Sequence, residues 1–168
     1  MTSEIYIQKL KLKIHPEGGY YREIYRSPEL IPSLPDRYIG IHRFSTSIYY
    51  LLKGDQFSAF HRLKSDETWH FYEGCSLVLF IINTKGILTK KILGRNIKKD
   101  EHFQLVVDKG QWFAAHPLDH SSFTLAGCTL SPGFELSDFE MGNRDNLIKY
   151  YPQHSKIIKR LTKREPSS

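Results

Sequence analysis

A histidine and a glutamate are the sequence's leading candidates for acid and base chemistry. His61 and Glu67 follow Gly54 in a segment with strand-like composition. The unperturbed pKa of histidine, about 6.5, suits a general base or a ligand, and glutamate is seldom buried without a partner. We predict that both face a pocket, where His61 abstracts or relays a proton and Glu67 orients it. The alternatives are a hydrogen-bonded interior histidine and a glutamate in a polar loop with Ser65 and Asp66.

His70 is the third candidate catalytic residue. Strict alternation along a strand places Trp69 and Phe71 on the face of Glu67, and His70 with Tyr72 on the opposite face. A β-bulge would reverse this assignment. His70 therefore either joins the pocket or packs on the outside of the sheet or in a dimer contact.

Several more residues are candidates for binding a ligand. They are Tyr20, Arg22, Ser47, Tyr49, Tyr72 and Glu135. The planar guanidinium of Arg22 would recognise a carboxylate or phosphate, or else form a surface ion pair. A tyrosine, Tyr20, Tyr49 or Tyr72, would serve as the acid. Glu135 would orient a histidine, or belong to a loop cluster that holds the C-terminal helix.

These residues depend on a series of short strands. Runs rich in β-branched and aromatic residues alternate with turns, and turn signals at intervals of roughly ten residues are typical of a β-sandwich or barrel. The predicted strands cover residues 48–52, 57–63, 68–72, 77–82, 88–93, 103–107, 112–115 and 123–130. A small barrel of this kind can hold one ligand at its open end.

Helices are expected at both ends of the strand region. Apolar residues at helical spacing predict a short N-terminal helix at about 2–13, before a turn at His15–Gly19. The segment at about 143–163 is predicted to be helical, with a break at Pro152. We therefore predict one domain, residues 1–168, with a jelly roll at about 15–142.

The composition excludes several classes of protein. The chain has 168 residues, 40% hydrophobic and 25% charged, as expected for one globular domain. It has no apolar run of about 20 residues and no signal-peptide pattern at its start, so we expect a cytoplasmic protein without a membrane partner. The net charge is +6, but the basic residues cluster at 149–164 without a nucleic-acid motif, so no nucleic-acid partner is predicted. Cys75 and Cys128 match no metal or redox spacing.

The segment from Gly54 to Gly74 resembles the first cupin motif. In a typical metal cupin, two histidines and a glutamate of this motif, with a later histidine, bind a divalent ion. His61 and Glu67 stand at two of these positions, whereas Leu63 and Phe113 replace the other two. No cofactor is therefore predicted, and a divalent metal would need a third donor besides His61 and Glu67, for example His70.

Three further segments extend the resemblance. Residues 15–23, 44–52 and 125–142, together with 65–74, are similar to the cupin 5 family. The resemblance implies an all-β cupin jelly roll, a barrel or sandwich similar in shape to the nucleotide-sugar 3,5-epimerases. It also implies a homodimer and a polar pocket. The family has no settled activity, so the resemblance brings no reaction.

The leading functional hypothesis is a metal-independent pocket for a small polar molecule, such as a sugar or nucleotide-sugar. If the protein is an enzyme, isomerase or epimerase chemistry by proton transfer fits these residues best. The first alternative is a metal-dependent dioxygenase or isomerase. The second alternative is a non-catalytic ligand-binding module.

Overall fold

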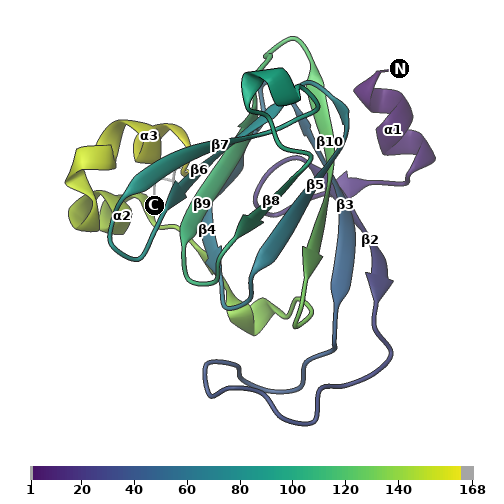
Figure 1. Cartoon of the computed structure of the whole chain (residues 1–168), viewed down its shortest axis with the longest axis vertical. Helices are drawn as coiled ribbons and strands as arrows, with labels where there is room; N and C mark the ends of the chain where they lie inside the picture. The colour runs from purple at the N-terminus through teal and green to yellow at the C-terminus, as the bar shows by residue number, and fades with distance from the viewer. Residues whose placement is uncertain (1, 164–168) are drawn as a thin grey trace, which may run out of the picture.

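Two antiparallel β-sheets face each other in the computed structural model, which describes residues 2–163 (Figure 1). The ends of the predicted domain, residues 1 and 164–168, lie outside this range. The first sheet has the order β1 (Lys13–Ile14), β2 (Tyr20–Arg26), β3 (Thr46–Lys53), β10 (Phe123–Leu130), β5 (Glu67–Gly74) and β8 (Gln104–Val107). The second has the order β11 (Phe139–Met141), β4 (Ser58–Leu63), β9 (Trp112–Pro117), β6 (Leu77–Ile82) and β7 (Leu88–Leu93). The predicted jelly-roll fold class is confirmed.

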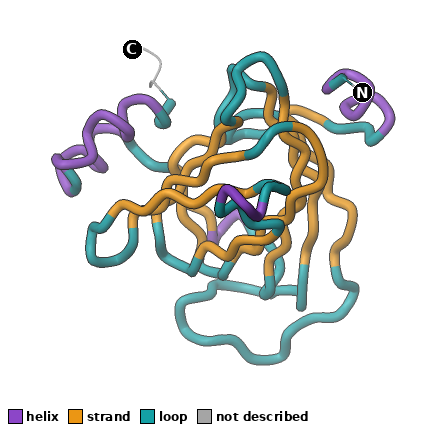
Figure 2. Tube along the Cα trace, turned by 45° about the horizontal axis from the view of Figure 1, so that its top comes forward, coloured by secondary structure: helices purple, strands orange, loops and turns teal. Residues whose placement is uncertain are grey.

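Short helices flank the sheets. The α-helices are α1 (Ser3–Lys9), α2 (Arg144–Tyr150) and α3 (Ser155–Arg160), and the 3-10 helices are η1 (Ile97–Lys99), η2 (Leu136–Asp138) and η3 (Pro152–His154). Helix α1 lies beside β2 and β3, whereas α2 and α3 lie at the opposite side of the molecule (Figure 1). The loop between β2 and β3 extends away from the sheets (Figure 2). No helix within residues 2–163 is long and apolar enough to cross a membrane.

Three groups of buried side chains hold these layers together. The largest lies between the sheets and includes Trp69 and Phe113. A second joins the outer face of the five-stranded sheet to α2 and α3 through Phe60, Leu147 and Ile158. A third packs residues of α1 onto one end of the six-stranded sheet. Helices therefore cover the outer face of one sheet and only one end of the other.

Two glycines allow the turn before β2 to pack closely against the neighbouring strands. Gly18 and Gly19 have φ angles of +128° and +72°, which favour glycine. A Cβ atom on Gly18 would lie 2.1 Å from the carbonyl oxygen of Phe57. The backbone carbonyl of Glu17, the residue before these glycines, accepts a hydrogen bond from the Ala59 amide at 3.2 Å. The turn thus fixes Glu17 against β4.

We expect the substitution Gly18→Ala to destabilise the protein by roughly 2–4 kcal/mol, because it combines an unfavourable φ with a backbone clash. Urea unfolding at neutral pH measures this loss. Gly40→Ala is the matched control, since Gly40 has a φ of +84° but nothing within 4 Å of its added Cβ. That control should lose only about 1 kcal/mol. Equal losses in the two variants would contradict the close packing of the turn.

Candidate functional site

A cavity of about 370 Å³ lies between the inner faces of the two sheets. Its walls are mainly apolar, with Ile48, Leu63 and Trp69 among them. Polar groups gather at two places. The buried part is lined by His15, Glu17, Tyr50, Glu67 and Cys128, and the more exposed part by Glu23 and Arg26. An apolar cavity with a few convergent polar groups is the usual form of a small-molecule site.

Glu67 is a carboxyl group in an apolar environment. It lies at the start of β5 with 6% of its surface exposed, and its Oε2 accepts a hydrogen bond from Trp69 Nε1 at 2.7 Å. Burial raises the pKa of Glu67 from 4.5 to about 8, and the negative charge of Glu17 adds to this effect. Glu67 is therefore largely protonated at neutral pH.

Glu17 is the second carboxyl group of the cavity. Its Oε2 accepts a hydrogen bond from the Ser58 hydroxyl at 2.9 Å and lies 3.4 Å from His61 Nδ1. Its Oε1 accepts no hydrogen bond from any residue that the structure describes. Glu17 therefore presents an open acceptor atom, and Glu67 supplies a proton in the same cavity.

His15 completes the polar part of the cavity. Its Nδ1 accepts a hydrogen bond from the Glu17 amide at 3.1 Å, so its proton lies on Nε2 when the ring is neutral. Burial lowers the pKa of His15, which favours the neutral ring. The rings of Tyr21 and Tyr50 contact it edge-on, with centroids 4.5 and 5.2 Å away.

Two further cavity residues remain uncharged. The Tyr50 hydroxyl donates to the carbonyl of Gly18 at 2.8 Å, and burial raises its pKa well above 10. Burial also raises the pKa of the Cys128 thiol, which lies in hydrogen-bonding contact with Glu67. A buried thiol of this kind is a poor nucleophile. The polar cavity residues left as candidates for a chemical role are therefore Glu17, Glu67 and His15.

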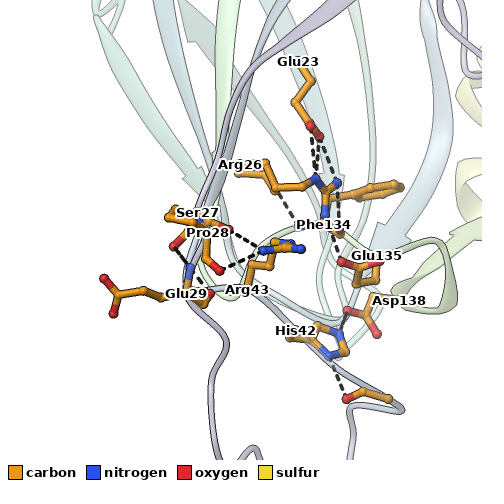
Figure 3. A network of polar contacts seen from close by, with 12 residues as sticks. Glu23, Arg26, Ser27, Pro28, Glu29, His42, Arg43, Phe134, Glu135 and Asp138 are labelled. Atoms are coloured by element: carbon orange, nitrogen blue, oxygen red, sulfur yellow. Dashed lines mark hydrogen bonds and ion pairs between the residues drawn. The ribbon is translucent and has the colours of Figure 1, made fainter.

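A bulge in β2 directs Glu23 and Arg26 to the same face of the sheet. The pairing of β2 with β3 shifts between Glu23 and Tyr25. The Arg26 guanidinium forms ion pairs with Glu23 and Glu135, both at 2.9 Å, and donates to the Phe134 carbonyl at 3.2 Å (Figure 3). These contacts raise the pKa of Arg26, with the Glu23 hydrogen bond as the largest cause. Arg26 is thus already engaged with acceptors of the protein.

Of the three predicted catalytic residues, only Glu67 lines the cavity. His61 is 2% exposed, and its Nδ1 lies 2.7 Å from the Ala59 carbonyl. Its ring packs against Phe113, with centroids 4.0 Å apart. The structure therefore places His61 behind Glu17, in the hydrogen-bonded interior position considered above as the alternative. From there it can position Glu17 through the 3.4 Å contact.

His70 lies on the outer face of the six-stranded sheet. Its Nε2 contacts the Thr129 hydroxyl at 3.2 Å, and its ring lies parallel to that of Tyr72. Ser47 contacts the same Thr129 hydroxyl at 3.3 Å, and Tyr49 packs edge-on against Tyr72. The predicted alternation thus holds from Glu67 to Tyr72, before the irregular pairing at the end of β5, and these four predicted residues gather outside the cavity.

The remaining predicted ligand residues also lie outside the cavity lining. Tyr20 packs beneath α1, and Arg22 donates to the carbonyl of Leu10 at 3.0 Å. Glu135 holds Arg26. On β2, Tyr21 lines the cavity instead of its neighbour Tyr20. On β3, Ile48 and Tyr50 line it instead of their neighbours Ser47 and Tyr49. A shift of one residue exchanges the two faces of a strand.

The sequence reasoning missed Glu17 and His15 as site residues. Both lie in the segment His15–Gly19, which the sequence analysis interpreted only as a turn. A signal was present, because a carboxyl group and an imidazole stand in a turn whose backbone requires two glycines, next to a proline. Tyr50 and Cys128 were not recognised as cavity residues, because each lies in a strand-like run without a distinguishing motif.

Comparison with known proteins identifies the family. Residues 4–142 match the model of Cupin_5, described as Cupin superfamily (DUF985). The chain belongs to this family. No curated protein matches the chain.

Two solved structures are similar to this Cupin_5 chain over nearly their whole length. Protein SO0799 from Shewanella oneidensis is 37% identical with a TM-score of 0.89, and the match covers 98% of this chain and 99% of that one. A hypothetical protein from Leishmania major is 31% identical with a TM-score of 0.89, covering 98% and 100% of the two chains. Oxalate decarboxylase from Bacillus subtilis shares the fold at 16% identity and a TM-score of 0.56, over 92% of this chain and 40% of that one.

The donors that this Cupin_5 chain retains do not fit the metal site of a typical cupin. Leu63 lines the cavity where such a cupin has a histidine, and Phe113 covers His61 where it has another. Glu67 is engaged by Trp69, and His61 lies outside the lining. Across residues 2–163, no group of three or more His, Cys, Asp or Glu side chains could hold a metal ion. His70, the suggested third donor, lies on the opposite face of β5 from Glu67.

We expect the stability of the protein to decrease as the pH rises from about 5 to 8, to the extent that Glu67 determines it. The folded-state pKa of about 8 lies above the ordinary value of 4.5, so the folded protein binds more protons than the unfolded chain in this interval. Glu67→Gln should remove this dependence, which amounts to on the order of 1 kcal/mol per pH unit. Urea unfolding at several pH values measures it.

Glu73→Gln is the matched control for that series. Glu73 is on the same strand, but hydrogen bonds, first from the Gly74 amide, lower its pKa. Its contribution is therefore constant between pH 5 and 8. Parallel stability curves for the wild type and Glu67→Gln would contradict the raised pKa of Glu67.

We expect the purified protein to retain far less than one metal ion per chain after incubation with iron, manganese, nickel and zinc and then desalting. Two separated donors give a weak site for a transition metal. Elemental mass spectrometry measures the metal content, and Glu67→Ala should leave it unchanged. One tightly held ion per chain that is lost in this variant would refute the assignment.

Proposed function

We propose that the cavity binds a small, uncharged polar molecule of about the size of a monosaccharide and catalyses proton transfer on it. The observation that carries this proposal is the pair of buried carboxyl groups, with a protonated Glu67 and an accepting Glu17 on one cavity. Pairs of titratable groups in contrasting environments are typical of acid and base catalysis. The Cupin_5 fold supplies the cavity but does not by itself indicate a reaction.

The charges of the cavity favour a neutral ligand. Among residues 2–163, Arg26 is the one lysine or arginine that lines it, and this side chain is engaged by Glu23 and Glu135, while two carboxyl groups lie at the buried end. A bound anion would need unpaired cationic donors, which strong phosphate and carboxylate contacts require. This argument favours a sugar over a nucleotide-sugar, and the volume of about 370 Å³ agrees with a ligand of that size.

The two carboxyl groups suggest a division of roles. The Glu17 carboxylate would remove a proton from a carbon beside a carbonyl group, breaking a C–H bond and forming an O–H bond on Glu17. Glu67 would donate its proton to the carbonyl oxygen, so that an enol forms. Return of the two protons, with delivery to the other carbon or the other face, gives an isomer or epimer and restores both residues. His15, with its proton on Nε2, would assist the transfer as a hydrogen-bond donor.

His61 is a positioning residue in this scheme. It lies behind Glu17, at 3.4 Å from Nδ1 to Oε2, and Ser58 donates to the same oxygen. Both contacts engage Oε2 and leave Oε1 of Glu17 without a hydrogen bond from the described residues. The role of base that the sequence analysis assigned to His61 is thus transferred to Glu17 in our proposal.

We expect the protein to incorporate deuterium from D₂O beside the carbonyl group of short neutral aldoses or ketoses. Proton NMR of the sugar measures the exchange. Glu67→Gln and Glu17→Gln should each lower the rate by about 10²-fold or more, the usual contribution of an acid or base. Glu73→Gln, on the outer end of β5, should retain the wild-type rate.

Binding is measured separately by the shifts of cavity amides in protein NMR spectra. A sugar that binds in the cavity without any deuterium uptake would contradict the catalytic role and favour the non-catalytic binding module. Sugars that neither bind nor exchange would contradict both parts of the proposal. The homodimer implied by the family resemblance stays a prediction, and sedimentation velocity measures it.

A further inference from the structure

A second hollow, of about 430 Å³, opens on the surface beside the cavity. We call it the basic cleft. Four cationic side chains and two carboxylates line it, so its charge is opposite to that of the cavity interior. The cations are Arg37, Arg62, Lys64 and Lys109. Leu63 and Phe139 line both hollows and form the wall between them.

Two buried aromatic rings hold the guanidinium groups of the basic cleft. Arg37 lies over the ring of Tyr38, and Arg62 lies over the ring of Trp112, both 4.6 Å from the ring centroid. Tyr38 and Trp112 are each 8% exposed, so these platforms belong to the core. Stacked guanidinium groups lose little conformational freedom when they bind an anion.

Several donors of the cleft have no acceptor within hydrogen-bonding distance. Arg37 donates to the Lys64 carbonyl and contacts the Tyr38 hydroxyl, but it pairs with no carboxylate among residues 2–163. The Nζ atom of Lys109 lies 3.7 Å from Asp66, which is beyond a normal hydrogen bond. These groups therefore keep donors available for a ligand.

The carboxylates of the cleft are already engaged. Glu140 pairs with Arg62 at 2.6 Å. Asp138 is buried, with Oδ2 at 2.5 Å from His42 Nε2 (Figure 3), and its Oδ1 lies 3.6 Å from the ammonium of Lys64. Lys64 faces Asp138 and Lys109 faces Asp66 at similar distances of 3.6 and 3.7 Å, so neither ammonium group is tightly paired. Both can therefore join Arg37 and the outer edge of Arg62 in attracting an anion.

We propose that the basic cleft binds a small phosphorylated molecule. A phosphate group has three acceptor oxygens and a higher negative charge than a carboxylate, which has two oxygens, so it can contact more of these donors at once. The side chains of Leu63 and Phe139 offer an apolar surface to the organic part of such a ligand. This site is independent of the proposed catalysis in the cavity.

The test is a protein NMR titration with inorganic phosphate and pyrophosphate, and with acetate at matched ionic strength. We expect saturable shifts at Lys64, Lys109 and Gly110 with pyrophosphate, weaker shifts with phosphate and none with acetate. The double variant Arg37→Gln/Lys109→Gln should bind pyrophosphate at least tenfold more weakly. Lys98→Gln/Lys99→Gln removes the same charge from the exposed helix η1 and should bind like the wild type.

Four outcomes would overturn the proposal. Equal losses in the two double variants, or an acetate response like that of pyrophosphate, would mean general attraction to a basic protein. Shifts that never saturate would mean that the cleft is not a site. Tighter binding of an oligouridylate, lost in the Arg37→Gln/Lys109→Gln variant, would assign the cleft to RNA. Unchanged amide shifts of cavity residues establish that each variant is folded.

Discussion

The burial of a carboxyl group between two sheets is the constraint on which the site depends. Glu67 faces the interior beside Trp69, and the second carboxyl group of Glu17 lies on the same cavity. Two charged carboxylates in such a place would be strongly unfavourable, so one of them retains its proton. The surrounding structure serves this arrangement: Trp69 and Ser58 donate to the carboxyl oxygens, and the glycines of the turn bring Glu17 against the barrel.

The fold follows from the sequence more directly than the site does. All eight strands predicted from short β-branched and aromatic runs are present, at boundaries within a few residues. Strands β1, β2 and β11 were not predicted, because β1 and β11 are very short and β2 is rich in charged residues that pair locally. Alternation also placed Trp69 and His70 on opposite faces of β5, as the structure shows.

The orientation of β2 and β3 could not be obtained in the same way. Their sequences carry polar and aromatic residues at both odd and even positions, so no apolar stripe marks the inner face. Tyr20, Tyr49 and their neighbours were therefore assigned to the pocket, whereas the cavity is lined by Tyr21 and Tyr50. The bulge after Glu23 also changes which residues of β2 face the cavity from that point of the strand onward. Only tertiary pairing fixes such features.

Apolar residues stand at two positions where a typical metal cupin has histidines, and they belong to the apolar core around the glutamate whose pKa is raised, Glu67. Leu63 adds apolar surface to the cavity of Glu67, and Phe113 packs against His61 and Trp69. In a metal cupin, a cation at this place would favour the ionised glutamate. Here Glu67 is buried and experiences the charge of a second carboxyl group, Glu17, so its protonated form is favoured. Apolar residues at two typical metal-donor positions thus accompany a glutamate that favours its neutral form.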